Sequence, residues 1–256
     1  MGRGGSPPAM TLWASTDISV NGVDLTGIDL RLQPGMDLAG RIAFEASMLP
    51  IPTDLSRITV QLSPAPTAGI SVAVNAPRIT PENDGTFNLE GIAPGRYLLS
   101  ATQPVVGTTS GAAWSMKSVR LGDVDVTDGG FEIRPNEPTR NVVLTFTDKV
   151  TELSGTLLDP ANRPSQALSI IMFSTDRSQW TSRSRRLRPP LRPGTDGKFK
   201  FTGLAPGEYF LAALGDFEQA DVLKPDFLEQ VAAAAMKITL AEGEKKVQDV
   251  RIAGGG

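Results

Sequence analysis

Two stretches of 18 residues, 112 positions apart, are nearly the same in this chain. The first, DGTFNLEGIAPGRYLLSA, begins at Asp84, and the second, DGKFKFTGLAPGEYFLAA, begins at Asp196. The chain has only two tyrosines, Tyr97 and Tyr209, and they occupy the same place in the two copies. The repeat therefore predicts one local structural unit that is folded twice.

Each copy predicts two strands joined by a tight corner. Asp-Gly ahead of alternating apolar residues is a turn signal, because glycine adopts backbone angles that other residues resist. In APG, proline fixes one backbone angle and glycine frees the next. A tyrosine after this turn fits the tyrosine corner of Greek-key sandwiches, where the ring is buried and the hydroxyl bonds to upstream backbone. The predicted corner residues are Gly85, Pro94, Gly95 and Tyr97 in the first copy and Gly197, Pro206, Gly207 and Tyr209 in the second.

The repeat extends beyond these stretches. LAGRIAFE and LSGTLLDP place Gly40 opposite Gly155, and RITVQLSP lies opposite ALSIIMFS. RITVQLSP alternates as a half-buried strand does, whereas ALSIIMFS is apolar enough to be buried on both faces. In the second copy, KPDFLEQVAAAAMKITL predicts a short helix that starts at Pro225 and covers the open end of the sandwich.

A different match lies at the start of the chain. Trp13 precedes VDLT as Trp114 precedes VDVT, and 11 positions separate tryptophan from aspartate in both cases. The second occurrence closes the first full repeat, so the first is predicted to be the tail of an earlier, incomplete repeat. A tryptophan at a repeated position indicates packing in a core. The predicted domains are a leader with the terminal strands of the incomplete repeat (1–33), a first β-sandwich (34–147) and a second β-sandwich (148–254).

The composition favours short strands and excludes several kinds of chemistry. The 26 glycines and 20 prolines suit many strands joined by turns. The chain has neither cysteine nor histidine, which removes disulfides, thiolate chemistry, the commonest general base and the commonest metal ligand. A net charge of −3 gives no general attraction to nucleic acid or anionic membranes. We expect no catalytic residue, no cofactor, no metal and no nucleic-acid partner, and we see no apolar run long enough to cross a membrane.

The pattern D-G-x-F-x-[LF]-x-G-[IL]-A-P-G-x-Y resembles that of the carboxypeptidase regulatory-like domains. These are relatives of the prealbumin-like and collagen-adhesin B-type sandwiches, and the resemblance covers residues 34–254 as two copies. It implies an all-β fold of tandem Greek-key β-sandwiches, prealbumin-like or Ig-like, with the one short helix in the second. It also implies non-catalytic modules of secreted or cell-envelope proteins, some of which bind carbohydrate in this fold class.

The segment RSQWTSRSRRLRPPLRP gathers six arginines around Trp180 with almost no acidic residue nearby. Guanidinium groups pair with phosphate or sulfate, and tryptophan can stack on a sugar ring, so the segment is a candidate carbohydrate-binding site. The alternative, which we favour, is an exposed strand pair with solvated arginines and with Trp180 over the edge of the core. The candidate ligand-binding residues are Trp180, Arg183, Arg185, Arg186 and Arg188, flanked by Arg177 and Arg192.

One acidic segment, GDVDVTDGG, brings Asp123, Asp125 and Asp128 close together in the sequence. Carboxylates at such spacing suggest calcium, but the ligand spacing of a calcium-binding loop and its downstream glutamate are missing. We therefore interpret the segment as an acidic turn between strands.

The sequence thus predicts a non-catalytic structural, adhesion or spacer module of a larger secreted or cell-envelope protein. Its expected location is extracellular, periplasmic or on the cell surface, as the resemblance implies. The expected partners are the neighbouring domains of a longer chain and another envelope protein. The alternative function is a carbohydrate-binding module that uses Trp180 and the neighbouring arginines. Proline and polar residues at 135–139 predict a short, stiff connection between the sandwiches.

Overall fold

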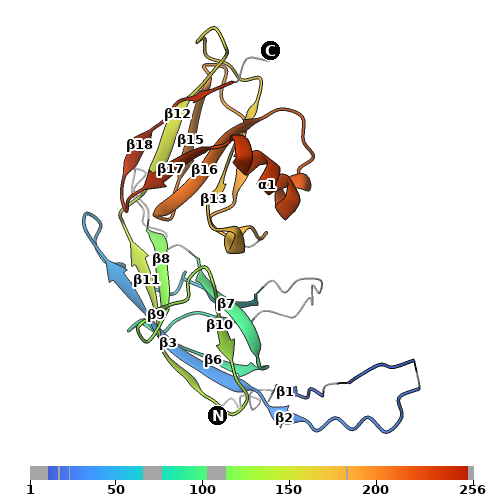
Figure 1. The fold of residues 1–256 in the computed structure, drawn as a ribbon. Coiled ribbons are helices and arrows are strands. Elements are labelled where there is room, and N and C mark those ends of the chain that lie inside the picture. The colour runs from blue at the N-terminus through green and yellow to red at the C-terminus, as the bar shows by residue number, and fades with distance from the viewer. Residues whose placement is uncertain are drawn as a thin grey trace, which may run out of the picture.

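Two β-sandwiches follow one another along the chain and are stacked end to end (Figure 1). Together they form the all-β fold that the sequence predicts, with one α-helix among the described residues, in the second sandwich. No helix in the described part of the chain is long and apolar enough to cross a membrane. The computed structural model describes residues 11–16, 18–22, 24–65, 77–102, 114–182 and 184–252.

The first sandwich packs a sheet of order β10-β7-β4-β5 against a sheet of order β6-β3-β11-β8-β9. Its buried side chains form one cluster between the two sheets. Its strands are β3 (Met36–Glu45), β4 (Val60–Pro64), β5 (Arg78–Ile79), β6 (Thr86–Ile92), β7 (Gly95–Ala101), β8 (Ser115–Leu121), β9 (Val124–Asp125), β10 (Phe131–Ile133) and β11 (Thr139–Thr147).

The second sandwich packs a sheet of order β15-β12-β18, in which β19 also pairs with β12, against a sheet of order β14-β13-β16-β17. Two 3-10 turns and the helix α1 accompany these sheets. The elements are β12 (Glu152–Leu158), β13 (Ser169–Ser174), η1 (Arg177–Gln179), β14 (Arg188–Leu191), β15 (Lys198–Thr202), β16 (Gly207–Leu214), η2 (Asp221–Leu223), α1 (Pro225–Ala234), β17 (Met236–Leu240), β18 (Lys245–Val247) and β19 (Val250–Arg251).

The first and last strands of each sandwich run parallel. β3 pairs with β11, and β12 pairs with β18 and β19, while the other described strand pairs are antiparallel. The repeated glycine of the first strand makes this close approach possible. A Cβ atom at Gly40 would collide with the carbonyl oxygen of Val142, and one at Gly155 would collide with that of Gln248. The sequence match between the two glycines therefore has a packing cause.

The alternating segment in the first sandwich buries Ile58, Val60 and Leu62 completely. β13 is buried on both faces, as its continuous apolar sequence predicts. Ile170 and Met172 face the core between the sheets, while Ile171 and Phe173 belong to a separate cluster under α1.

The helix α1 begins at Pro225, as predicted, but its predicted place was wrong. Leu228 and Val231 pack on the outer face of the sheet that contains β13 and β16, not over an open end of the sandwich. The physical reason is the outer face of β13, because Ile171 and Phe173 would be exposed to water without a cover.

The two sandwiches differ at one equivalent point. The first sandwich has an insertion between β7 and β10, which consists of β8 and β9 and extends the sheet beside β11. At the equivalent place, between β16 and β17, the insertion of the second sandwich consists of η2 and α1. The VDVT segment lies in this insertion, so β10 and β11, rather than VDVT, close the first sandwich. Residues 134–138 join β10 to β11, so the stiff connection predicted at 135–139 lies inside the first sandwich. The connection between the sandwiches is residues 148–151 instead.

The corner tyrosines lie alike in the two sandwiches. The Tyr97 hydroxyl donates to the carbonyl oxygen of Ala93 at 2.9 Å, and the Tyr209 hydroxyl donates to that of Ala205 at 2.7 Å. Gly85 and Gly197 have φ of +83° and +73°, in the left-handed region that the Asp-Gly turn requires. This is the geometry of a tyrosine corner, in which a buried hydroxyl is satisfied by backbone four residues upstream.

Candidate functional site: the interface between the sandwiches

Trp180 is a buried residue of the second sandwich. Its indole nitrogen donates to the carbonyl oxygen of Ser174 at 2.7 Å, and its ring lies edge-on to Phe173 with 5.4 Å between ring centres. It belongs to the cluster that α1 covers, and 6% of the residue is exposed. A ring in this position offers no open face to a sugar.

The arginines of the candidate site are distributed over several environments. Arg183 lies outside the described residues. Arg177 pairs with Glu229 of α1 at 2.9 Å, and Arg188 and Arg192 donate to backbone carbonyl groups of their own sandwich. Arg185 and Arg186 lie together and point toward the first sandwich, so these two define the site.

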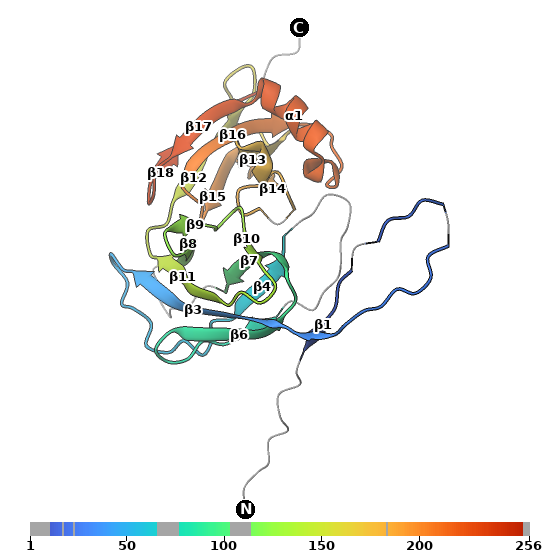
Figure 2. The ribbon, with the colours of Figure 1, turned by 60° about the horizontal axis from the view of Figure 1, so that its bottom comes forward.

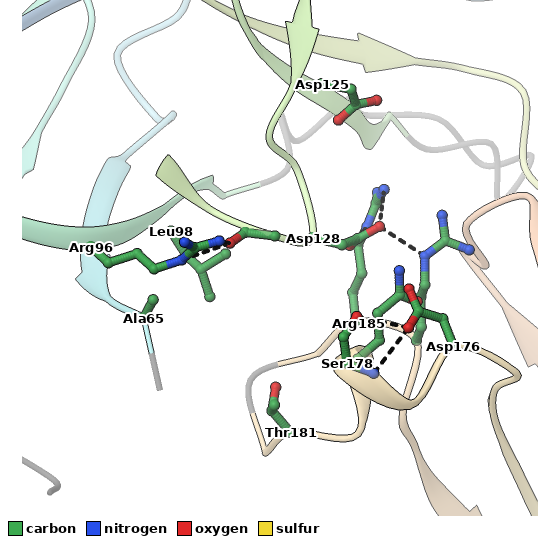
Figure 3. Close-up of a pocket in the computed structure, with 12 residues that line it drawn as sticks. Ala65, Arg96, Leu98, Asp125, Asp128, Asp176, Ser178, Thr181 and Arg185 are labelled. Carbon is green, nitrogen blue, oxygen red and sulfur yellow. Dashed lines mark hydrogen bonds and ion pairs between the residues drawn. The ribbon is translucent and has the colours of Figure 1, made fainter. Parts of the chain in front are cut away.

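Asp128 of the first sandwich lies between these two guanidinium groups (Figure 3). The Arg185 Nε is 2.7 Å from Oδ1 of Asp128, and the Arg186 Nε is 2.8 Å from Oδ2. Asp128 follows β9 in the turn that leads to β10, and this turn is held by Thr127, whose hydroxyl donates to Asp125. We call Asp128, Arg185 and Arg186 the interface triad.

Backbone groups fix both arginines further. Arg185 Nη1 donates to the carbonyl oxygens of Met116 and Lys117 in β8, at 2.9 and 3.1 Å. Arg186 Nη1 donates to the carbonyl oxygen of Pro206 at 2.7 Å and lies 3.4 Å from the hydroxyl of Tyr209. The triad thus connects the inserted hairpin of one sandwich to the tyrosine corner of the other.

A corner glycine makes room for this contact. A Cβ atom at Gly207 would lie 2.5 Å from Arg186 Nη1, whereas the equivalent Gly95 faces only the ring of its own Tyr97. The corner of the second sandwich therefore serves packing inside the sandwich and contact with its neighbour.

The triad keeps its charges because the partners compensate for burial. Burial by itself would raise the pKa of Asp128, but hydrogen bonds and charge from Arg185 and Arg186 outweigh it and hold this pKa below its ordinary value. Burial would lower the pKa of Arg186, yet its contacts with Asp128 raise this pKa instead. An ion pair that is mostly buried and supported by hydrogen bonds is a specific contact, because the loss of one partner leaves the other charge uncompensated.

A second ion pair joins the sandwiches beside the triad. Lys117 of β8 lies 2.6 Å from a carboxylate oxygen of Glu45 and 3.0 Å from one of Glu242, which follows β17 in the second sandwich. Both interface contacts therefore use the β8–β9 insertion of the first sandwich.

A polar cleft of about 490 Å³ opens beside the triad. Arg96 and Asp125 contribute to it from the first sandwich, and Asp176 and Gln179 from the second. The described residues contain no group of three His, Cys, Asp or Glu side chains that could hold a metal ion. Asp128 is engaged by the two arginines and Asp125 by Thr127, so the acidic segment acts as a turn and as an anchor for the neighbouring sandwich.

The sequence placed the arginine segment and the acidic segment in separate roles, and the structure brings them together. Each segment showed in the sequence that it lacks an opposite charge. The arginine segment has almost no acidic residue nearby, and the segment of Asp128 contains no basic residue. What the sequence did not show is which distant segment supplies the opposite charge, because the partners lie 57 and 58 residues apart.

The chain matches no protein-family model and no curated protein. Among solved structures it is similar to GBS52, the minor pilin of Streptococcus agalactiae, at 12% identity, with 87% of this chain and 98% of that chain covered and a TM-score of 0.35. It is also similar to the shaft pilin SpaA of Lactobacillus rhamnosus GG, at 10% identity, with 86% and 98% covered and a TM-score of 0.31.

A third similar structure is the Bacillus anthracis TIE protein, at 12% identity and a TM-score of 0.27; the alignment covers 87% of this chain and 37% of that protein. At these values the likeness assigns neither a family nor an activity to the chain.

Proposed function

We propose that this chain is a non-catalytic structural module in which two β-sandwiches are held in a fixed relative orientation as a spacer. The observation that carries the proposal is the interface triad. The arginines that were the best candidates for an external ligand are occupied by Asp128 of the neighbouring sandwich and by backbone carbonyl groups.

The connection between the sandwiches supports the same function. Only residues 148–151 separate β11 from β12. Asp148 at the start of this connection accepts hydrogen bonds from the backbone N–H groups of Ser47, Met48 and Leu49 at 2.5–2.7 Å. A short connection that is tied to one sandwich restricts the rotation of the other, as a spacer requires.

The finer assignments are part of this proposal. The sequence pattern supports membership of the carboxypeptidase regulatory-like type, a location outside the cytoplasm, and association with neighbouring domains or another envelope protein. The carbohydrate-binding alternative is not favoured, because Trp180 is buried and Arg185 and Arg186 are engaged.

The proposal is tested by measuring the distance between the sandwiches. The chain has no cysteine, so spin labels can be placed on Glu90→Cys in β6 and Lys245→Cys in β18 without removing native thiols. Double electron–electron resonance is expected to give one narrow distance distribution. Asp128→Asn is expected to broaden it, because the amide cannot neutralise the two guanidinium groups.

The matched control is Asp123→Asn in the same segment, whose carboxylate is not a member of the triad. It should leave the distribution narrow. A broad distance distribution in the spin-labelled chain that keeps Asp128 would show that the sandwiches move independently. The spacer proposal would then be wrong.

A further inference from the structure

Residues 14–16, 18–22 and 24–32 form a long arm that extends away from both sandwiches (Figure 2). The arm leaves and returns at the strand pair β1 (Leu12–Trp13) and β2 (Gln33–Pro34), where the Trp13 indole nitrogen donates to the carbonyl oxygen of Pro34 at 3.0 Å. Trp13 itself packs partly against the core of the first sandwich.

The returning half of the arm has the side-chain pattern of a buried strand. Ile28, Leu30 and Leu32 alternate with Asp29 and Arg31, yet the three apolar residues are 52, 55 and 67% exposed. Alternation at period two places all three on one face of an extended segment. The described residues provide nothing that covers this face, and a contiguous exposed apolar face marks an interaction site.

The same order of features recurs in the first sandwich, where the corresponding residues are buried. There Trp114 is followed by VDVT, then by β11, and then by the ELSG sequence of β12. In the arm, Trp13 is followed by VDLT, then by residues 28–32, and then by the DLAG sequence of β3. Residues 28–32 therefore stand where β11 stands, and the apolar residues of β11 that they match, Val142, Leu144 and Phe146, are fully buried.

Strand pairing at the base of the arm agrees with this correspondence. In the first sandwich, the residue after Trp114 pairs antiparallel with Thr147, the residue after Phe146. In the arm, Trp13 pairs antiparallel with Gln33, the residue after Leu32. The pair β1–β2 thus lies at the end of the arm that corresponds to the end of the β8–β11 pair, with the tryptophan strand shifted by one residue.

From the exposed apolar face and the repeated order of features, we propose that residues 28–32 are the closing strand of a further β-sandwich, which is the body of the earlier repeat. The apolar face of these residues completes the core of that sandwich. In that sandwich the strand lies parallel to the first strand, as β11 lies beside β3. This inference is independent of the spacer proposal, because it concerns another surface and another readout.

A second copy of the chain does not fit as the occupant. In the first sandwich β11 already fills the place between β3 and β8, and in the second sandwich β18 and β19 already pair with β12. Neither described sandwich has a vacant position for a closing strand.

The experiment compares one thiol in two settings. Leu30→Cys introduces the only cysteine of residues 1–256. Its rate of modification by a maleimide is measured in residues 1–256 produced alone and, by mass spectrometry of the peptide that contains position 30, in the protein made from its own gene in its native cell. We expect the thiol to react freely in the first and more than about 100-fold more slowly in the second, because a core strand reacts only when its sandwich opens. Met48→Cys, at a loop position that is 77% exposed, is the control and should react equally in both.

A photo-crosslinking amino acid at position 30 of the native protein identifies the occupant. Cross-links to a sandwich with the same strand–corner–strand pattern, in the same polypeptide, would support the proposal. Equal reactivity of the thiol in both settings would overturn it, and so would protection with cross-links to a second copy or to an unrelated protein. Thermal unfolding of the Leu30→Cys chain should match that of the parent, since the side chain is exposed there.

Discussion

Asp148 shows how one carboxylate can hold a connection in place. Its side chain is fully buried, and three successive backbone N–H groups of the loop after β3 donate to its Oδ2. Burial by itself would raise the pKa of Asp148, but the hydrogen bonds from Leu49, Met48 and Ser47 outweigh it and lower this pKa to about 2. The carboxylate is therefore charged at neutral pH, and its charge strengthens its hydrogen bonds to the loop.

This depressed pKa predicts a pH-dependent stability. Because the pKa is lower in the folded state than the ordinary value of 3.8, the stabilisation is complete above about pH 4 and is lost as the pH falls toward 2. It amounts to about 2 kcal/mol at neutral pH. Asp148→Asn should lower the free energy of unfolding at pH 7 by about this amount and flatten its pH dependence between 4 and 2, as measured by urea unfolding. Parallel stability curves for the two proteins across this pH range would contradict the assignment.

At the scale of elements, α1 is explained by the strand beneath it. β13 is apolar on both faces, so a single sandwich core leaves Ile171 and Phe173 without a partner. The helix supplies Leu228 and Val231 to that outer face, and Trp180 joins them after η1. A tryptophan in an arginine-rich segment is thus a core residue, because the nearest apolar surface lies directly under it.

A pair of leucine substitutions tests this packing. Leu228→Ala removes a fully buried side chain and should lower the free energy of unfolding by about 2–4 kcal/mol, the usual cost of such a cavity. Leu223→Ala in η2 is the matched control, since that leucine is 49% exposed, and its effect should stay within about 0.5 kcal/mol. Both are measured by chemical denaturation; equal effects would show that α1 does not cover a core.

At the scale of the whole molecule, the two insertions have different structural roles. The β8–β9 insertion of the first carries Lys117 and Asp128, which contact the second sandwich, while the α1 insertion covers the second sandwich's own outer face. The same point of the fold therefore serves contact between sandwiches in one repeat and internal packing in the other.

Substitution of Arg186 should separate the unfolding of the two sandwiches. Arg186→Met removes the contacts with Asp128, Pro206 and Tyr209 and leaves Asp128 with one partner, at an expected cost of about 3 kcal/mol. Differential scanning calorimetry should show one coupled transition in the parent and two in the variant. Arg177→Met breaks an exposed pair with Glu229 and removes a guanidinium that lies 5.7 Å from the centre of the Trp180 ring. It should change the unfolding free energy by less than about 1 kcal/mol and keep one transition, because neither contact crosses between the sandwiches. A single transition in both variants would contradict the role of the triad.

The sequence by itself determined the features that depend on neighbours along the chain. The alternation at Ile58, Val60 and Leu62 predicted a half-buried strand, and KPDF predicted the start of α1 at Pro225, because strand and helix patterns have a short period. The two copies of the corner motif predicted an all-β chain with two sandwiches for the same reason.

Only the tertiary structure decided the contacts between distant segments. The sequence around Arg185 and Arg186 does not indicate that Asp128 is their partner. The sequence around Asp148 likewise does not indicate that it binds the loop at 47–49. The positions of α1 and Trp180 are fixed by the apolar outer face of β13. These contacts depend on which surfaces meet once the sheets have formed, and charge or apolarity in the sequence gives the kind of partner without its position. The sequence repeat thus determined that each unit is a β-sandwich. Only the packing of the two sandwiches decided that Arg185 and Arg186 of the second bind Asp128 of the first.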